Sequence, residues 1–231
     1  MKYTKIFCLL ITILLSGSFS FAQKKTPPKP VKEILTITGT SDTQMIFLGS
    51  VDGSEYKNSY FGLNMKLPES WIIQEREVND ELKKIGKNSL KGKDKKTQQS
   101  LDQAAQKVTI LLTATKDIIG IAKNAVLALA VEKPAPLVRI RNGNDYLRLA
   151  LQSYKLMQLP PDFKYSEKIQ SEKLGSETFY YIDVERIGYT QRFYATARKG
   201  YAVFFLMQFF DKTDLESMKE ILRNADFSIK E

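Results

Sequence analysis

Hydrophobic and polar positions alternate most regularly between Thr178 and Phe210, where three strand-like runs follow one another. Two glycine-containing pairs separate the runs, Gly188-Tyr189 and Lys199-Gly200, and both suit the tight turns of antiparallel hairpins. The third run, from Tyr201 to Phe209, is apolar on both faces, as is typical of a strand covered on two sides. The pattern therefore predicts an α/β/α sandwich with a mostly antiparallel central sheet.

The turn positions also predict which residues face one another across the first hairpin of this meander (residues 178–210). A two-residue turn at Gly188-Tyr189 places charged and aromatic side chains on one face of the sheet. The predicted pairs on that face are Glu185 with Arg192, Asp183 with Tyr194, Tyr181 with Thr196, and Phe179 with Arg198. The opposite face is predicted to be mostly apolar and contains Tyr180, Ile182, Val184, Phe193, Ala195, Ala197, Ala202, Phe204 and Leu206.

The rest of the chain predicts further strands and the helices that cover the sheet. Alternation in Leu63, Met65 and Leu67 indicates a strand that ends at Pro68. Two more strands are predicted at Lys107–Lys116 and Ala125–Val131. Helices are predicted at Asn79–Leu90 with Asn79 as its cap, at Thr97–Gln106, from Asn142 or Asn144 up to Pro160, and after a capping box at Thr213-Asp214-Leu215-Glu216.

The first residues have the composition of a secretory signal peptide, residues 1–22. Two lysines in Met1–Lys5 precede an apolar run from Ile6 to Leu15, and Ser20-Phe21-Ala22 offers the small residues that signal peptidase reads. Residues 23–55 follow as a linker and N-terminal extension, which begins with a stretch rich in proline and lysine. We expect export to the periplasm or the extracellular space, with one folded domain at residues 56–231.

A short motif before the first firm strand resembles a known family. Tyr56-Lys57-Asn58-Ser59-Tyr60-Phe61-Gly62 leads into the strand, Pro68-Glu69-Ser70-Trp71 follows it, and the meander with its C-terminal helix comes far downstream. This arrangement resembles the PsbP-like domains, which share their fold with the DcrB and Mog proteins. The resemblance implies an α/β/α sandwich that acts through protein contacts. Gly62 and Pro68 are then expected to shape turns and Trp71 to fill the core.

Histidine is absent from the whole sequence, and the one cysteine, Cys8, lies inside the predicted signal peptide. These absences exclude Ser-His triads and thiolate nucleophiles from the mature chain and remove the commonest metal ligand. Ser54-Glu55-Tyr56-Lys57 matches the S-x-x-K spacing of some hydrolases, but that motif needs a helix where Gly53 predicts a turn. No acidic loop is dense enough for calcium. We therefore expect no enzymatic activity, no metal and no cofactor.

One face of the meander carries the residues that we expect to bind a partner: Tyr181, Asp183, Glu185, Arg192, Tyr194 and Arg198. Two interpretations of this group are open. It is either a cross-strand charge network that holds the sheet in register, or a polar cleft whose guanidinium groups and rings meet a partner or an anionic ligand.

The charge distribution limits the classes of partner. The sequence has a formal net charge of +9, but two lysines lie in the predicted signal peptide and four more between residues 23 and 32. The folded part is only mildly basic, which disfavours nucleic acid. Lys83–Lys96 is a lysine-rich segment that either binds an anionic surface or is a solvated helix face and loop.

These observations favour a secreted or periplasmic protein-binding or assembly module whose partner is another envelope or secreted protein. One alternative is a small-ligand-binding protein or hydrolase that uses Asp183, Glu185, Arg192 and Tyr194. Another is peripheral binding to an anionic membrane or envelope polymer through the lysine-rich segment.

Overall fold

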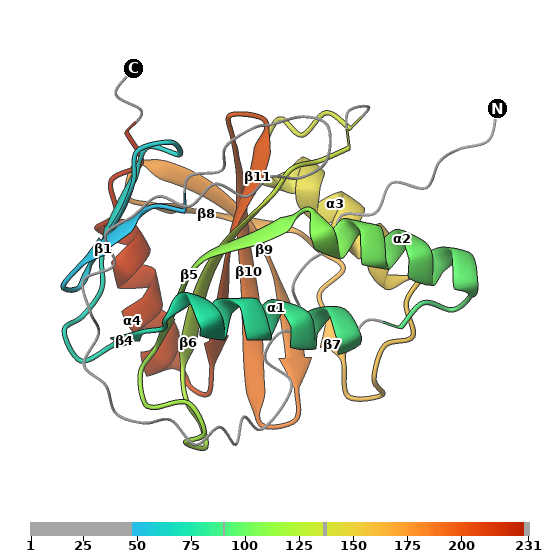
Figure 1. Cartoon of the computed structure of the whole chain (residues 1–231), viewed down its shortest axis with the longest axis horizontal. Helices are drawn as coiled ribbons and strands as arrows, with labels where there is room; N and C mark the ends of the chain where they lie inside the picture. Colours follow the sequence, from blue (N-terminus) through green and yellow to red (C-terminus); the bar gives the residue numbers. More distant parts are fainter. Residues whose placement is uncertain (1–47, 90, 136–137, 229–231) are drawn as a thin grey trace.

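The structure, a computed structural model, describes residues 48–89, 91–135 and 138–228. The predicted signal peptide and most of the predicted N-terminal extension, residues 1–47, lie outside these ranges. The described residues form one large and one small antiparallel sheet together with four helices (Figure 1).

The large sheet has eight strands, and all of its pairings are antiparallel. Its order is β4-β5-β6-β11-β10-β9-β7, and β8 also pairs with β9. The meander supplies the long strands β9, β10 and β11, which confirms the predicted mostly antiparallel central sheet. The strands are β4 (Ile72–Ile73), β5 (Val108–Thr115), β6 (Val126–Glu132), β7 (Lys164–Tyr165), β8 (Gln170–Leu174), β9 (Glu177–Arg186), β10 (Tyr189–Arg198) and β11 (Tyr201–Phe209).

The two hairpin turns of the meander differ in how well the sequence predicted them. The turn at Lys199-Gly200 is confirmed, since Arg198 pairs with Tyr201 and both turn residues have positive φ, 49° and 78°. The first turn is instead Ile187-Gly188, with Arg186 paired to Tyr189. Gly188 occupies the second turn position with a φ of 87°, as a type II turn requires, rather than the first.

This turn shifts the register of β9 against β10 by two residues from the predicted pairs, which were wrong. Asp183 faces Arg192, Tyr181 faces Tyr194 and Glu185 faces Thr190. Because the shift is an even number of residues, every side chain keeps its predicted face.

The small sheet packs against one face of the large one. Gly62, with a φ of 62°, precedes its last strand, which confirms the predicted strand after Phe61. That strand is tied to the C-terminal segment by two backbone hydrogen bonds between Asn64 and Asp226, of 2.9 and 2.8 Å. Trp71 is buried, as expected. The strands are β1 (Ser50–Asp52), β2 (Glu55–Asn58) and β3 (Leu63–Lys66).

Four helices begin and end near the predicted positions: α1 (Arg76–Ser89), α2 (Lys95–Gln106), α3 (Gly143–Tyr154) and α4 (Lys212–Arg223). Asn142 caps α3, as one of the two predicted options. Two predicted caps are wrong. In α1, Glu75 O accepts the first hydrogen bonds, so Asn79 lies buried inside the helix and does not cap it. In α4, the cap is Asp211 rather than Thr213.

The large sheet has a hydrophobic core on each face, as predicted. Phe193, Phe204 and Ile182 point into the first core, which the helices α1, α2 and α3 cover. Tyr194 and Phe205 point into the second core. Helix α4 and the small sheet cover that face together, so the second covering layer is part helix and part strand (Figure 1).

Candidate functional site

The polar face of the meander lies on the α4 side of the sheet, and its centre is an ion pair between Asp183 and Arg192. Arg192 Nε and Nη2 donate to the two carboxylate oxygens of Asp183 at 2.7 and 2.8 Å. Arg192 Nη1 donates to the Tyr194 hydroxyl at 3.3 Å, and the guanidinium carbon lies 4.1 Å from the centre of the Tyr181 ring. The structure therefore brings four of the six predicted binding residues into one cluster.

Two residues that the sequence did not single out extend this cluster towards α4. The Tyr194 hydroxyl donates to Glu172 Oε2 at 2.7 Å, and Lys219 Nζ of α4 forms an ion pair with Glu172. Lys219 and Tyr194 are buried, whereas Glu172 is partly exposed. The result is a continuous chain of hydrogen bonds across β9, β10, β8 and α4, which we call the meander network: Asp183, Arg192, Tyr194, Glu172 and Lys219.

The pKa shifts follow from these contacts. Burial alone would lower the pKa of Arg192, but the hydrogen bonds to Asp183 and Tyr194 outweigh it, and the pKa is raised. Burial and the hydrogen bond to Glu172 raise the pKa of Tyr194. Burial alone would raise the pKa of Glu172, but the hydrogen bonds from Lys219 and Tyr194 lower it. The shifts keep Arg192 and Glu172 charged and Tyr194 neutral at neutral pH, so these three groups hold one another in place.

The other two predicted residues lie apart from this network. Arg198 pairs with Glu177 and lies 5.3 Å from the centre of the Phe227 ring. Glu185 is exposed and faces Thr190 and Lys164, at the end of β9. Each nitrogen of Arg192 already has a partner inside the protein, which favours the interpretation as a register-fixing network. As a binding surface, the meander face stays a prediction.

The S-x-x-K spacing does not produce a serine-lysine pair on a helix. Ser54 lies in the turn before β2, and Lys57 lies on that strand with its ammonium 2.8 Å from Glu55. The hydrogen bond from Lys57 to Glu55 raises the pKa of the lysine, whereas a general base would need a lowered pKa. Among the described residues, no three or more Asp and Glu side chains form a cluster that could hold a metal ion.

A second candidate surface is apolar and was missed by sequence reasoning. Within the described residues the exposed large hydrophobic side chains are Ile187 at 84%, Ile121 at 56%, Ile118 at 39% and Ile72 at 37%. Ile118 and Ile121 lie in the β5–β6 loop, and Ile187 is in the β9–β10 turn, both at the bottom of the view in Figure 1. We call these four residues the isoleucine end.

Strand pairing shows that the isoleucine end is one end of the large sheet. Thr115, Val126, Gln208 and Gln191 lie in one row across β5, β6, β11 and β10. The loop that follows Thr115 and the turn that precedes Gln191 therefore project from the same edge, about three strand spacings or 14 Å apart. Ile72 pairs with Thr115 and so belongs to the same end.

The β5–β6 loop is held at its base by the buried side chain of Asn124. Its Oδ1 accepts from Asp117 N at 2.8 Å, and its Nδ2 donates to the carbonyl oxygens of Asp117 and Ile118 at 2.7 and 3.2 Å. Thr115 Oγ1 donates to the same Asp117 carbonyl at 2.7 Å. The loop therefore presents its isoleucines from a fixed backbone rather than from a loose one.

The charges around the isoleucine end have both signs and largely cancel. Lys116 pairs with Asp214 at 2.9 Å, and Arg186 pairs with Asp162 at 2.8 Å. The remaining charged residues in or next to these loops are Asp117, Lys123, Glu185, Asp211 and Lys212. Because β11 lies between β6 and β10, the exposed Asp211 and Lys212 that follow it lie between the loop and the turn, so charges of both signs stand among the isoleucines as well as around them.

The sequence did contain one sign of this surface. Ile118-Ile119-Gly120-Ile121 is a run of three isoleucines around a glycine, between two predicted strands, where loops are usually polar. Ile187 carried no such sign, because the predicted turn placed it inside a strand.

Comparisons with known proteins show similarity in fold alone. No family model matches the sequence, and no curated protein matches it. One similar solved structure is LpqN, involved in cell envelope biogenesis of Mycobacterium tuberculosis, at 10% identity, covering 71% of this chain and 82% of that chain, with a TM-score of 0.40. Another is cyanobacterial PsbP (CyanoP) from Synechocystis, at 12% identity, covering 76% and 95%, also with a TM-score of 0.40.

No helix of the described residues is both long and apolar enough to cross a membrane.

Proposed function

We propose that this protein is a non-enzymatic binding module that docks onto another protein through the isoleucine end of its large sheet. The observation that carries the proposal is the gathering of Ile72, Ile118, Ile121 and Ile187 at one edge. Single exposed apolar residues are ordinary on protein surfaces, but several of them presented from the same end of one sheet are a candidate interaction site. The absence of histidine, and of cysteine after Cys8, supports a non-catalytic role.

The rim of the isoleucine end favours a protein partner over a lipid surface. A loop that enters an anionic membrane is usually flanked by unpaired basic residues, which add electrostatic attraction. Here Lys116 is paired with Asp214, and Asp117, Glu185 and Asp211 offset Lys123 and Lys212, so this end of the sheet has no net positive charge. The residues 1–22 support a partner outside the cytoplasm, since their pattern is that of a signal peptide.

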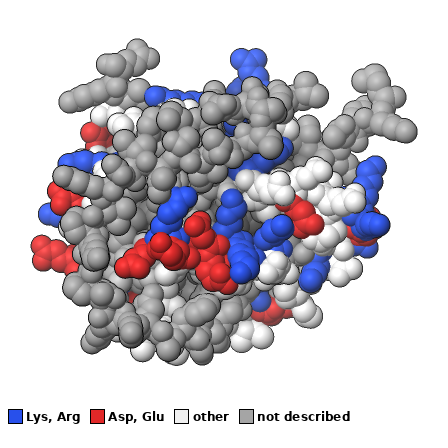
Figure 2. Space-filling view, viewed as in Figure 1, with Lys and Arg blue, Asp and Glu red and all other residues white. Residues whose placement is uncertain are grey.

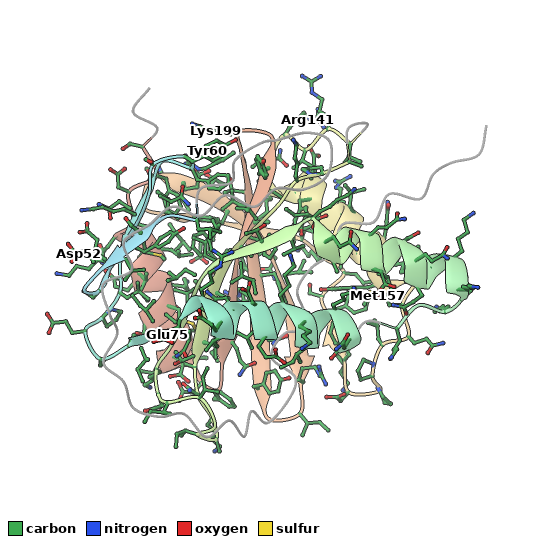
Figure 3. All side chains as sticks on the ribbon, viewed as in Figure 1. Asp52, Tyr60, Glu75, Arg141, Met157 and Lys199 are labelled. Carbon is green, nitrogen blue, oxygen red and sulfur yellow. The ribbon has the colours of Figure 1, made fainter. Side chains whose placement is uncertain are left out.

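Photo-crosslinking in the parent organism tests this proposal. A photoreactive residue at Ile187 should yield one dominant protein adduct. Lys199 is the matched control, because it is an exposed turn residue before a glycine at the opposite end of β10, beside Tyr60 (Figure 3). The same photoreactive residue at Lys199 should yield no such adduct.

The adduct must also depend on the rest of the isoleucine end. Adding Ile121→Ser to the chain labelled at Ile187 should reduce the adduct strongly, because Ile121 lies on the neighbouring loop and should contact the same partner. Equal adducts from Ile187 and Lys199, or an adduct that Ile121→Ser leaves unchanged, would overturn the proposal.

A further inference from the structure

A second surface, unrelated to the isoleucine end, gathers positive charge where α1 joins α2. Residues 83 to 96 include seven lysines and one acid, Asp94, which gives a local net charge of +6 (7 − 1). Figure 2 shows blue atoms grouped at the right-hand end of the molecule, where α2 begins. Six of these lysines are exposed, and we call them the lysine surface: Lys84, Lys87, Lys91, Lys93, Lys95 and Lys96.

Little negative charge offsets the lysine surface. Among the described residues, only Lys84 of the six has a carboxylate within ion-pair distance, with Glu81 Oε2 at 3.6 Å. Asp94 uses its carboxylate to cap α2, since its Oδ1 accepts from Thr97 N at 2.7 Å. The N-terminus of α2 adds its own positive dipole end to the same place.

The backbone beneath the lysines is fixed to the end of α3. Gln158 N donates to Lys91 O at 2.8 Å, and Gly92 pairs with Met157, which lies beside α2 in Figure 3. Gly92 N also donates to Gln98 Oε1 at 2.9 Å, and Lys93 Nζ donates to Lys155 O at 2.8 Å. Lys91, Lys93 and the lysines at the start of α2 are thus displayed on a backbone that is tied to α2 and to the end of α3.

We propose that the lysine surface attaches the protein peripherally to the anionic headgroups of a lipid bilayer. Lysine ammonium groups are point charges that suit a diffuse negative surface, and no arginine between residues 83 and 96 offers the bidentate geometry of specific anion recognition. Protein interfaces are depleted in lysine and centre on aromatic or apolar anchors. The exposed large hydrophobic residues of the described chain all lie at the isoleucine end instead.

Sedimentation with lipid vesicles tests the attachment in the full chain. Wild-type protein should bind vesicles of phosphatidylcholine mixed with phosphatidylglycerol, should not bind pure phosphatidylcholine, and should be released between about 0.1 M and 1 M salt as the charges are screened. Each lysine near an anionic leaflet contributes about fivefold in affinity, so Lys87→Gln, Lys95→Gln and Lys96→Gln together should weaken binding about 100-fold.

The matched control removes the same charge elsewhere. Lys164→Gln, Lys168→Gln and Lys173→Gln change three exposed lysines at the β7–β8 edge of the sheet, and binding should fall by far less. Equal loss in the two triple variants would overturn the proposal, because net charge alone would then explain binding. Binding to pure phosphatidylcholine, or no binding at low salt, would overturn it as well. Tighter lysine-dependent binding to soluble polyglutamate than to vesicles would contradict attachment to lipid and would indicate an acidic protein as the partner.

Discussion

Asn124 and Asp117 are joined by two hydrogen bonds at the base of the β5–β6 loop. Asn124 Oδ1 accepts from Asp117 N at 2.8 Å, and Asn124 Nδ2 donates to Asp117 O at 2.7 Å. This pairing fixes the loop that carries Ile118 and Ile121. One buried amide thus links the stability of the sheet end to the presentation of the surface that we propose for docking.

Asn124→Ala should therefore affect both stability and binding. The substitution removes the three hydrogen bonds of the Asn124 side chain to the loop, and we expect a loss of about 2 kcal/mol in the free energy of unfolding. Partner affinity should also fall, although Asn124 is buried and touches no partner. Urea unfolding and the yield of the Ile187 adduct measure the two effects. An unchanged adduct yield would show that partner binding does not depend on the hydrogen bonds of Asn124.

The isoleucines themselves should contribute little to stability. Because Ile121 and Ile187 are exposed, replacing either with serine should change the free energy of unfolding by less than about 0.5 kcal/mol. Ile182→Ser is the matched control, since Ile182 is fully buried on β9 and the same change there should cost about 3 kcal/mol or more. If Ile187→Ser destabilised the protein as much as Ile182→Ser, Ile187 would be a packing residue of the fold and not a residue available for docking.

Arg192 should behave as a structural residue. Arg192→Ala removes both bonds to Asp183 and leaves that carboxylate partly buried without its partner. We expect a loss of about 2 kcal/mol, below the range for fully buried pairs because Asp183 is a quarter exposed. A double-mutant cycle with Asp183→Asn measures the coupling between the two side chains. Full stability of Arg192→Ala, together with loss of partner binding, would instead make the meander face the binding site.

Glu172 should make stability depend on pH in acid. Its hydrogen bonds lower its folded pKa below the unfolded value of about 4.3, so the carboxylate stabilises the protein above that pH. This contribution is lost as the pH falls through the folded pKa. Glu172→Gln should be less stable than wild type at neutral pH, and the difference in unfolding free energy should shrink as the pH falls below the unfolded pKa and vanish below the folded pKa. Curves that stay parallel down to pH 3 or so would show that Glu172 is not the linked group.

Alternation and turn chemistry were enough to predict the centre of the fold, and local ambiguity explains the errors. The turn at Lys199-Gly200 was predictable because a tight hairpin turn needs positive φ, and Gly200 is the residue there that adopts it most easily. Gly188 can take either position of a two-residue turn, so the register of the first hairpin was off by two residues.

The candidate surfaces could likewise be predicted only as far as local spacing along the sequence determines them. Asp183, Arg192 and Tyr194 could be placed on one face from their spacing alone. Glu172 and Lys219 could not, since only the packing of β8 and α4 brings them there. Ile72, Ile118 and Ile187 are far apart in sequence, and only the strand order brings them to the same end of the sheet, which no local pattern contains.

Titration calorimetry of the purified protein against the partner captured at Ile187 tests the proposed docking most directly. Wild-type binding should show a negative heat-capacity change, the mark of buried apolar surface, and Ile121→Ser should weaken it tenfold or more, by about 1.5 to 3 kcal/mol. Lys173→Ser, an exposed change on β8, should leave the affinity unchanged. Equal affinities of wild type and Ile121→Ser would contradict docking through the isoleucine end.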